Sequence, residues 1–174
     1  MSRRPSLPLL ALAAIGGLLV ALLVMRSNSA PELQAQDLAV ARERWREHGP
    51  ADYEIILQMG GALTDRRRIV VRDHQVVEMT INDQTASESA WPFWSVDGLF
   101  GFLEDEIRNK ANPVPGLGVS DPRQIVLRAR FDEELGYPIY FLRHLLGRQQ
   151  GTEWEVVAFE TLSNRRPRGN KSPG

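Results

Sequence analysis

Three histidines, His48, His74 and His144, are the first candidates for acid–base or metal chemistry in this chain. A zinc site usually places two such residues four apart on a helix or within one short loop. No two of these histidines have that spacing, and the chain contains no cysteine. We expect His74 to lie in a turn and His144 in a strand, with structural rather than catalytic roles.

Two acidic clusters, residues 104–106 and 132–134, are the next candidates for cation binding or acid–base catalysis. Adjacent residues of a helix point in different directions, so the first cluster does not converge on one site. The second falls in a predicted turn and lacks the repeated aspartates and later glutamate of a calcium loop, which leaves calcium there as a minor alternative. The chain also lacks a nucleophile elbow and a glycine-rich phosphate loop. We therefore assign no catalytic, cofactor-binding or metal-binding residue and expect no cofactor.

A basic triplet, Arg66–Arg68, opens a predicted strand. Such a triplet can bind an anion, or it can protect an edge strand against sheet-to-sheet aggregation. The neighbouring Asp65 and the alternation along the strand favour the edge interpretation.

A group of three aromatic residues, Trp91, Phe93 and Trp94, surrounds Pro92 in a predicted loop. Aromatic side chains in a loop either close the end of a core or form a surface for a partner or a membrane interface. The core interpretation is the slightly more common one, yet this group is also the best candidate for recognition. Together with Tyr137 it forms the possible recognition surface of the chain.

Two predicted helices support these residues. Residues 31–48 carry an apolar stripe that includes Trp45, which we expect to hold this helix on a sheet, and Gly49-Pro50 ends the segment. Residues 95–111 form the second helix, with Ser95 as its N-cap and an apolar face that we expect to be buried.

The remaining regular segments read as strands. Residues 53–59 and 125–131 alternate between apolar and polar side chains, and further strands are expected at 67–72, 75–81, 139–146 and 153–162. Asp73-His74 has the length of a type I′ hairpin turn, and both residues tolerate the positive φ that this turn requires. The order is α-β-β-β-α-β-β-β, and short connections favour antiparallel pairing. We predict an α+β domain with an antiparallel sheet of about five or six strands and two helices packed on one face.

The amino-terminal segment, residues 7–25, is apolar throughout and follows Arg3 and Arg4. Its nineteen residues reach roughly 28 Å as a helix, close to the thickness of a bilayer core. It is therefore predicted to be a single-pass transmembrane helix with a cytoplasmic N-terminus and an extracytoplasmic C-terminal domain. The alternative is a cleaved signal peptide, after which the chain would be secreted.

The chain is accordingly divided into a cytoplasmic start (1–6), a transmembrane anchor or uncleaved signal (7–25), a linker (26–34), an extracytoplasmic α+β domain (35–162) and a disordered basic tail (163–174). Residues 31–162 contain 14 basic and 22 acidic residues, a net charge of −8. Nucleic-acid surfaces require clustered lysine and arginine, so we expect no nucleic-acid partner.

Several short segments resemble a bacterial domain family of unknown function found in secreted proteins and lipoproteins. They are Trp45, Tyr53, the IVVRDHQVV hairpin, SVDGLF and FDEELGYPIYF, spread over residues 40–160, and they are similar to a signature of the form Trp…Tyr…VRDG-V…LF…YD…GYP. The chain lacks the cysteines and the lipid-accepting cysteine common in that family. The resemblance implies no activity; Gly136 suits a turn with positive φ, Pro138 a strand start and Tyr137 the packing between them.

The most consistent functional prediction is a non-catalytic binding module for a protein or cell-envelope component, anchored in the cell membrane through residues 7–25. The contact would be the sheet face or the Trp91–Trp94 loop. A secreted hydrolase-like enzyme would instead need a cavity between helices and sheet, and a structural envelope-assembly protein would need an exposed apolar patch without a pocket.

Overall fold

A computed structural model describes residues 30–61, 64–113, 121–148 and 151–163. The chain divides into two compact units, Met1–Pro31 and Glu32–Gly174, and all the described helices and strands belong to the second. The predicted anchor at 7–25 and all of the predicted tail except Ser163 lie outside the described residues. Within the described ranges, no helix is both long enough and apolar enough to cross a membrane.

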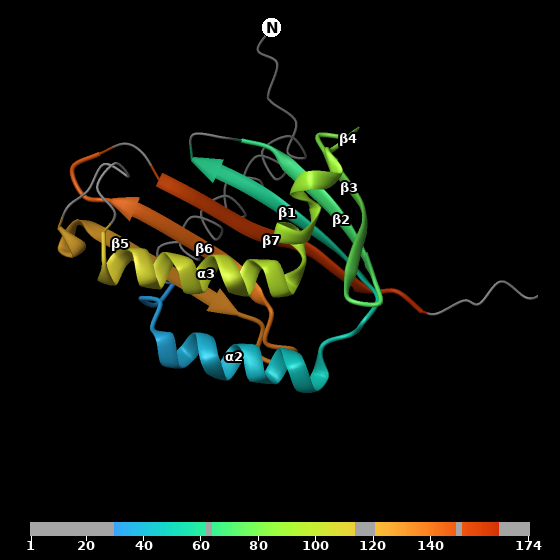
Figure 1. The fold of residues 1–174 in the computed structure, drawn as a ribbon, viewed down its shortest axis with the longest axis horizontal. Helices are drawn as coiled ribbons and strands as arrows, with labels where there is room; N and C mark the ends of the chain where they lie inside the picture. Colours follow the sequence, from blue (N-terminus) through green and yellow to red (C-terminus); the bar gives the residue numbers. More distant parts are fainter. Residues whose placement is uncertain (1–29, 62–63, 114–120, 149–150, 164–174) are drawn as a thin grey trace, which may run out of the picture. The chain divides into compact units, whose positions relative to one another are not determined.

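A seven-stranded antiparallel sheet forms the centre of the domain, in the order β4-β3-β2-β1-β7-β6-β5 (Figure 1). The strands are β1 (Tyr53–Gly61), β2 (Arg66–Arg72), β3 (Gln75–Ile81), β4 (Gln84–Thr85), β5 (Ile125–Phe131), β6 (Pro138–Leu145) and β7 (Gly151–Thr161). Two meanders, β1-β2-β3 and β5-β6-β7, are joined by the pairing of β1 with β7. The predicted α+β class and antiparallel pairing are confirmed.

Strand β4 is the element that the predicted strand count omits. It follows Asn82 and Asp83, both with positive φ, and pairs with β3 through Thr85 and Gln84. A two-residue strand is too short to show an alternating pattern, so the sequence indicated a loop there. The Asp73-His74 turn has positive φ at both residues, at 46° and 63°, as predicted.

Two α-helices, α2 (Ala35–His48) and α3 (Val96–Ala111), cover one face of the sheet (Figure 1). Ser95 caps α3 as predicted, because its hydroxyl oxygen accepts the Gly98 N–H at 3.0 Å. Helix α2 begins four residues later than predicted. The residues before it are extended along β5 instead, where the Leu33 N–H donates to the Leu127 carbonyl at 3.0 Å.

The space between the helices and the sheet is filled by side chains. Alternate residues of β1 point into it, as the sequence predicted, and α3 contributes one apolar face. Together these side chains form the hydrophobic core. Its largest fully buried residues are Trp154, Tyr53, Phe100, Phe141, Ile55, Leu57, Ile69, Met79, Leu99, Leu103 and Leu127. Burial of this apolar area is the main source of stability for such a layered domain.

An aromatic cluster of Trp45, Tyr53, Tyr137 and Phe159 joins α2 to the sheet. The Tyr53 ring lies 5.4 Å from Trp45, edge to face, and 5.3 Å from Phe159, stacked. Tyr137 stacks on Phe159 at 4.3 Å. Trp45 is only 3% exposed, which confirms its predicted role as the anchor of this helix.

Tyr53 also connects the sheet to α3. Its hydroxyl oxygen accepts the backbone N–H of Val96, the first residue of that helix, at 2.9 Å. A helix leaves its first N–H groups without intrahelical partners, so this bond satisfies one of them inside the core. Burial raises the pKa of the Tyr53 hydroxyl well above its usual value, so it stays neutral.

The turn before β6 passes very close to α2. Gly136 has φ of +85°, as the sequence predicted, and β6 begins at Pro138. A Cβ atom at Gly136 would lie 2.3 Å from the Ala41 carbonyl oxygen and 3.0 Å from the Trp45 nitrogen. Only glycine therefore allows this contact between the turn and the helix.

The edge interpretation of Arg66–Arg68 is wrong. Strand β2 lies inside the sheet, between β3 and β1. Arg68 is neutralised on the face away from the helices by Glu54 and Glu78, each at 2.6 Å. The charges of residues 66–68 are typical of an edge strand. They do not show that β3 and β4 lie beyond β2 in the sheet.

Replacing Gly136 by alanine should strongly destabilise the domain. We expect Gly136→Ala to lower the free energy of unfolding by about 3 kcal/mol, from the positive φ together with the clash against α2. The measurement is urea unfolding followed by circular dichroism. Gly101 is the matched control, since a Cβ there meets nothing within 4 Å, and Gly101→Ala should stabilise α3 by roughly 0.5–1 kcal/mol. Equal effects of the two substitutions would contradict the proposed close contact.

Removing the Tyr53 hydroxyl should lower the free energy of unfolding by less than Gly136→Ala does, and its effect should be concentrated at the start of α3. Tyr53→Phe keeps the ring contacts and leaves the buried Val96 N–H without its acceptor, which should cost about 1–3 kcal/mol. Amide hydrogen exchange should then be faster at the start of α3 than at its end. Unchanged exchange at Val96 would show that the bond does not hold the helix start.

Candidate functional site

The short helix η1 (Glu88–Trp94) carries the three aromatic residues singled out in the sequence. It connects β4 to α3 and packs against β3 and α3. The structure therefore brings Trp91, Phe93 and Trp94 together on one element. Tyr137 lies elsewhere, buried in the aromatic cluster with its ring on Phe159.

The two tryptophans of η1 are directed toward the domain. Trp91 donates its indole N–H to the Ala86 carbonyl at 3.2 Å, and both indoles pack against the core. The guanidinium of Arg67 lies over the Trp94 ring, 4.0 Å from its centroid. Arg67 is itself held by two hydrogen bonds to Asp65, at 2.7 and 2.9 Å. This cation–π contact between β2 and η1 fixes the position of Trp94.

Phe93 is directed away from the domain. It is 69% exposed, although its two aromatic neighbours are partly buried. The backbone beneath it is tightly packed, because a Cβ atom at Gly98 would lie 2.5 Å from the Pro92 carbonyl oxygen and 2.6 Å from that of Phe93. The Ser95 hydroxyl also donates to the Pro92 carbonyl at 3.3 Å. η1 thus presents one phenyl ring to solvent from a well-packed support.

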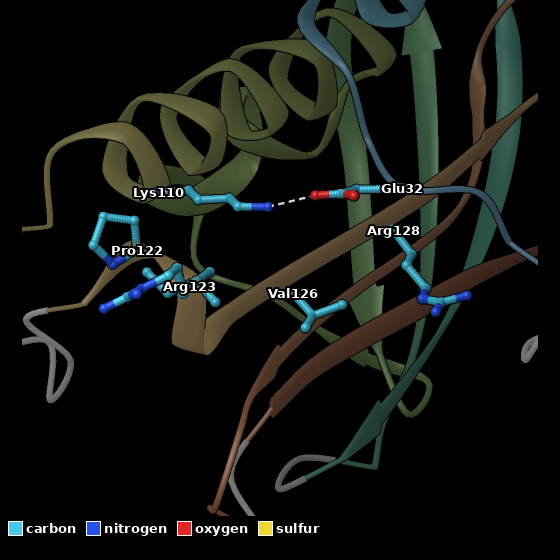
Figure 2. Close-up of a pocket in the computed structure, with 7 residues that line it drawn as sticks. Glu32, Lys110, Pro122, Arg123, Val126 and Arg128 are labelled. Atoms are coloured by element: carbon cyan, nitrogen blue, oxygen red, sulfur yellow. Dashed lines mark hydrogen bonds and ion pairs between the residues drawn. The ribbon is translucent and has the colours of Figure 1, made fainter.

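A pocket of about 500 Å³ lies beside the edge strand β5 (Figure 2). We call it the β5-edge pocket, and its lining residues are Glu32, Lys110, Pro122, Arg123, Ile125, Val126 and Arg128. The ammonium of Lys110, in the last turn of α3, lies 2.6 Å from the Glu32 carboxylate. That hydrogen bond lowers the pKa of Glu32 below its usual value.

No pattern in the sequence indicated this pocket. Its cations lie on α3, on the short helix η2 (Pro122–Gln124) and on β5, at separated positions in the chain. A local sequence pattern cannot reveal residues that come together only on folding. Glu32 lies beside these cations because it pairs with Arg128 at the edge of the sheet. The Asp121-Pro122 start of η2 was the one local signal, and it predicts a turn rather than a site.

The sheet face away from the helices carries paired polar groups. The Tyr140 hydroxyl donates to Glu153 at 2.8 Å, and Arg130 lies 5.0 Å from the Tyr140 ring and 3.6 Å from a Glu155 oxygen. Burial and the neighbouring Glu153 raise the pKa of Tyr140, so this hydroxyl remains protonated at neutral pH. Each carboxylate of this group is thus paired, Glu153 with the Tyr140 hydroxyl and Glu155 with Arg130, and the tyrosine is not activated as a nucleophile.

A second polar contact lies on the helical side of the sheet. Glu106 of α3 is nearly buried, and its carboxylate lies 3.2 Å from the Nε atom of Arg143 on β6. Burial raises the pKa of Glu106, while Arg143 acts in the opposite direction. The pair links α3 to β6 beneath the helix, which gives it a structural position.

Among the described residues, no group of three or more histidine, aspartate or glutamate side chains could hold a metal ion. The predicted acidic turn at 132–134 is used structurally. The Asp132 carboxylate accepts the backbone N–H groups of Glu134 and Leu135, at 3.1 and 2.7 Å. His74 occupies its predicted turn and His144 its predicted strand.

Part of the chain matches a known protein family. No curated protein and no solved structure matches the chain. Residues 37–115, which include most of α2 and all of β1 to β4, η1 and α3, match a family described as "Family of unknown function (DUF6174)". This match confirms the predicted resemblance to a domain family of unknown function, and it covers residues 37–115 of the chain.

Proposed function

We propose that this chain is a non-catalytic binding module for a protein of the cell envelope, with Phe93 as its central contact. The observation that carries the proposal is a phenylalanine side chain that is 69% exposed on the tightly packed helix η1. An aromatic anchor that is already rigid loses little conformational entropy when it binds. Such residues dominate the binding energy of many protein interfaces.

The surroundings of Phe93 suit a protein partner better than an anionic lipid surface. The same short helix also carries exposed polar side chains, among them Ser87 and Ser89, whose hydroxyls lie 3.1 Å apart at its start. An apolar centre with a polar rim is the usual arrangement of a protein interface. The net charge of −8 over residues 31–162 opposes attraction to anionic lipids.

The two alternative functions receive less support. A hydrolase-like enzyme would need a cavity between helices and sheet, and in the described part of the chain this space contains the packed core. An assembly protein would need a continuous apolar patch. Among the described residues, the large apolar side chains that are exposed lie at five separate positions of the sequence: Val40, Val77, Phe93, Leu146 and Val157.

The location of the module is part of the proposal. Residues 7–25 form an uninterrupted apolar segment after two arginines, which favours a membrane anchor and an extracytoplasmic domain. A binding module held at the membrane meets its partner at a raised effective concentration, so a small contact area suffices.

Protease added to intact cells should degrade the domain and leave a short amino-terminal fragment in the membrane. A tag at the C-terminus should disappear on immunoblots, while a cytoplasmic control protein survives. Release of the domain into the medium as a chain smaller than 19.6 kDa would indicate the cleaved signal peptide instead. Protection in intact cells with digestion after lysis would contradict the extracytoplasmic placement.

Removing the Phe93 ring should abolish partner binding without unfolding the domain. The tagged full-length chain is crosslinked in its own cells, and Phe93→Ala should reduce recovery of the partner by at least about tenfold. Val40→Ala is the matched control, because Val40 is 53% exposed on α2 and lies outside η1. Thermal unfolding should be unchanged in both variants. Equal recovery from wild type and Phe93→Ala would exclude this ring as the contact.

A further inference from the structure

The segment that carries Phe93 is acidic throughout. From Asp73 to Ile107 the chain contains eight aspartates and glutamates and neither lysine nor arginine. Helix η1 and the start of α3 lie in the middle of this segment. The charges nearest to Phe93 along the chain are therefore all negative, and such a local field acts on any partner that approaches the ring.

Four of these eight carboxylates are neutralised within the domain. They make ion pairs with arginines of α2, β2, β6 and α3 itself: Glu78 with Arg68, Glu104 with Arg42, Asp105 with Arg108 and Glu106 with Arg143. The other four make no ion pair with a cation in the part of the chain that the structure describes: Asp73, Asp83, Glu88 and Asp97. The unbalanced negative charge therefore remains on η1, the first turn of α3 and the two hairpin turns.

Glu88 and Asp97 are the two unpaired acids on the elements that hold Phe93, and both are exposed. Glu88 is the first residue of η1, and at about 2 Å per residue it lies roughly 10 Å from Phe93 along that helix. Asp97 precedes Gly98, where an added Cβ atom would lie 2.6 Å from the Phe93 carbonyl oxygen. The Debye length is about 10 Å in 0.1 M salt, so both charges act on a group that covers the ring.

Neither the arginine beneath η1 nor the helix dipoles cancel this charge. Arg67 is 9% exposed and is bound to Asp65 by two hydrogen bonds, at 2.7 and 2.9 Å. Glu88 and Asp97 each lie in the first turn of a helix, where the dipole favours an acid. The end of a helix is equivalent to only about half a positive charge, so most of each carboxylate charge stays available to a partner.

We propose that the partner bound through Phe93 is a basic protein segment. An apolar side chain of this segment covers the Phe93 ring, and lysine or arginine side chains on either side of it face Glu88 and Asp97. The inference rests on the proposed contact through Phe93 and adds the chemistry of the partner. Opposite charges at the rim of an interface accelerate association, and like charges exclude the wrong partners. The same rim therefore rejects acidic proteins.

Selection of a random peptide library on the full-length chain in phosphatidylcholine nanodiscs tests the charge of the partner. Peptides that also bind the Phe93→Ala variant are discarded, so that only ligands of the ring remain. These should carry a net positive charge, with an apolar residue between lysines or arginines. Ring-dependent peptides that are neutral or acidic would overturn the basic partner and leave the Phe93 contact intact. A selection without any ring-dependent peptide would overturn both.

Calorimetric titration of the selected peptides then locates the charges that attract them. Glu88→Gln/Asp97→Asn should weaken binding about fivefold or more, because it removes both carboxylates beside the ring. Glu133→Gln/Glu134→Gln is the matched control, since it removes two exposed acids from the turn between β5 and β6. This control should bind as the wild type does. Equal affinities of the two double variants would overturn the proposal.

Salt dependence provides a test that needs no substitution. Between about 0.05 M and about 0.5 M sodium chloride the Debye length falls from more than 10 Å to about 4 Å. The affinity of the wild type for the selected peptides should fall about fivefold or more over this range, and that of Glu88→Gln/Asp97→Asn should fall less. An affinity of the wild type that does not change with salt would overturn the proposal, whether or not the double variant folds.

Discussion

The contacts of Tyr53 are the constraint on which the rest of the domain depends. Its ring packs against Trp45 of α2 and Phe159 of β7, while its hydroxyl oxygen holds the first N–H of α3. One side chain therefore fixes both helices and the two central strands. Because η1 ends where α3 begins, the direction of Phe93 follows from the same contact.

Both candidate sites lie at the rim of the sheet, because its two faces are already used. One face is covered by helices and the other carries paired charges such as Arg68 with Glu54. η1 packs on β3 near one edge, and the β5-edge pocket lies at the opposite edge. Helix α3 connects them, with η1 before its first residue and Lys110 in its last turn. Its length sets their separation through a single rigid element.

Features determined by neighbouring residues could be predicted from the sequence, and features determined by distant pairing could not. The Asp73-His74 turn, the Ser95 cap and the positive φ of Gly136 depend on local backbone geometry, and all three are confirmed. The position of β2 inside the sheet depends on its pairing with β1 on one side and β3 on the other, which the charge pattern of its own segment does not show. Likewise, the sequence places three aromatics together on η1, but only the contacts of Trp94 with Arg67 and of Trp91 with Ala86 distinguish the partly buried rings from Phe93.

The matched range of residues 37–115 cannot contain the whole folding unit. It ends before β5, so it leaves out β7, which pairs with β1 along nine residues from Tyr53 to Gly61. Without β7, the strand that carries Tyr53 would become an open edge, and the Phe159 and Tyr137 rings that cover it would be missing. The aromatic cluster therefore joins the matched part to the three strands that follow, and the domain must be considered as one structure through β7.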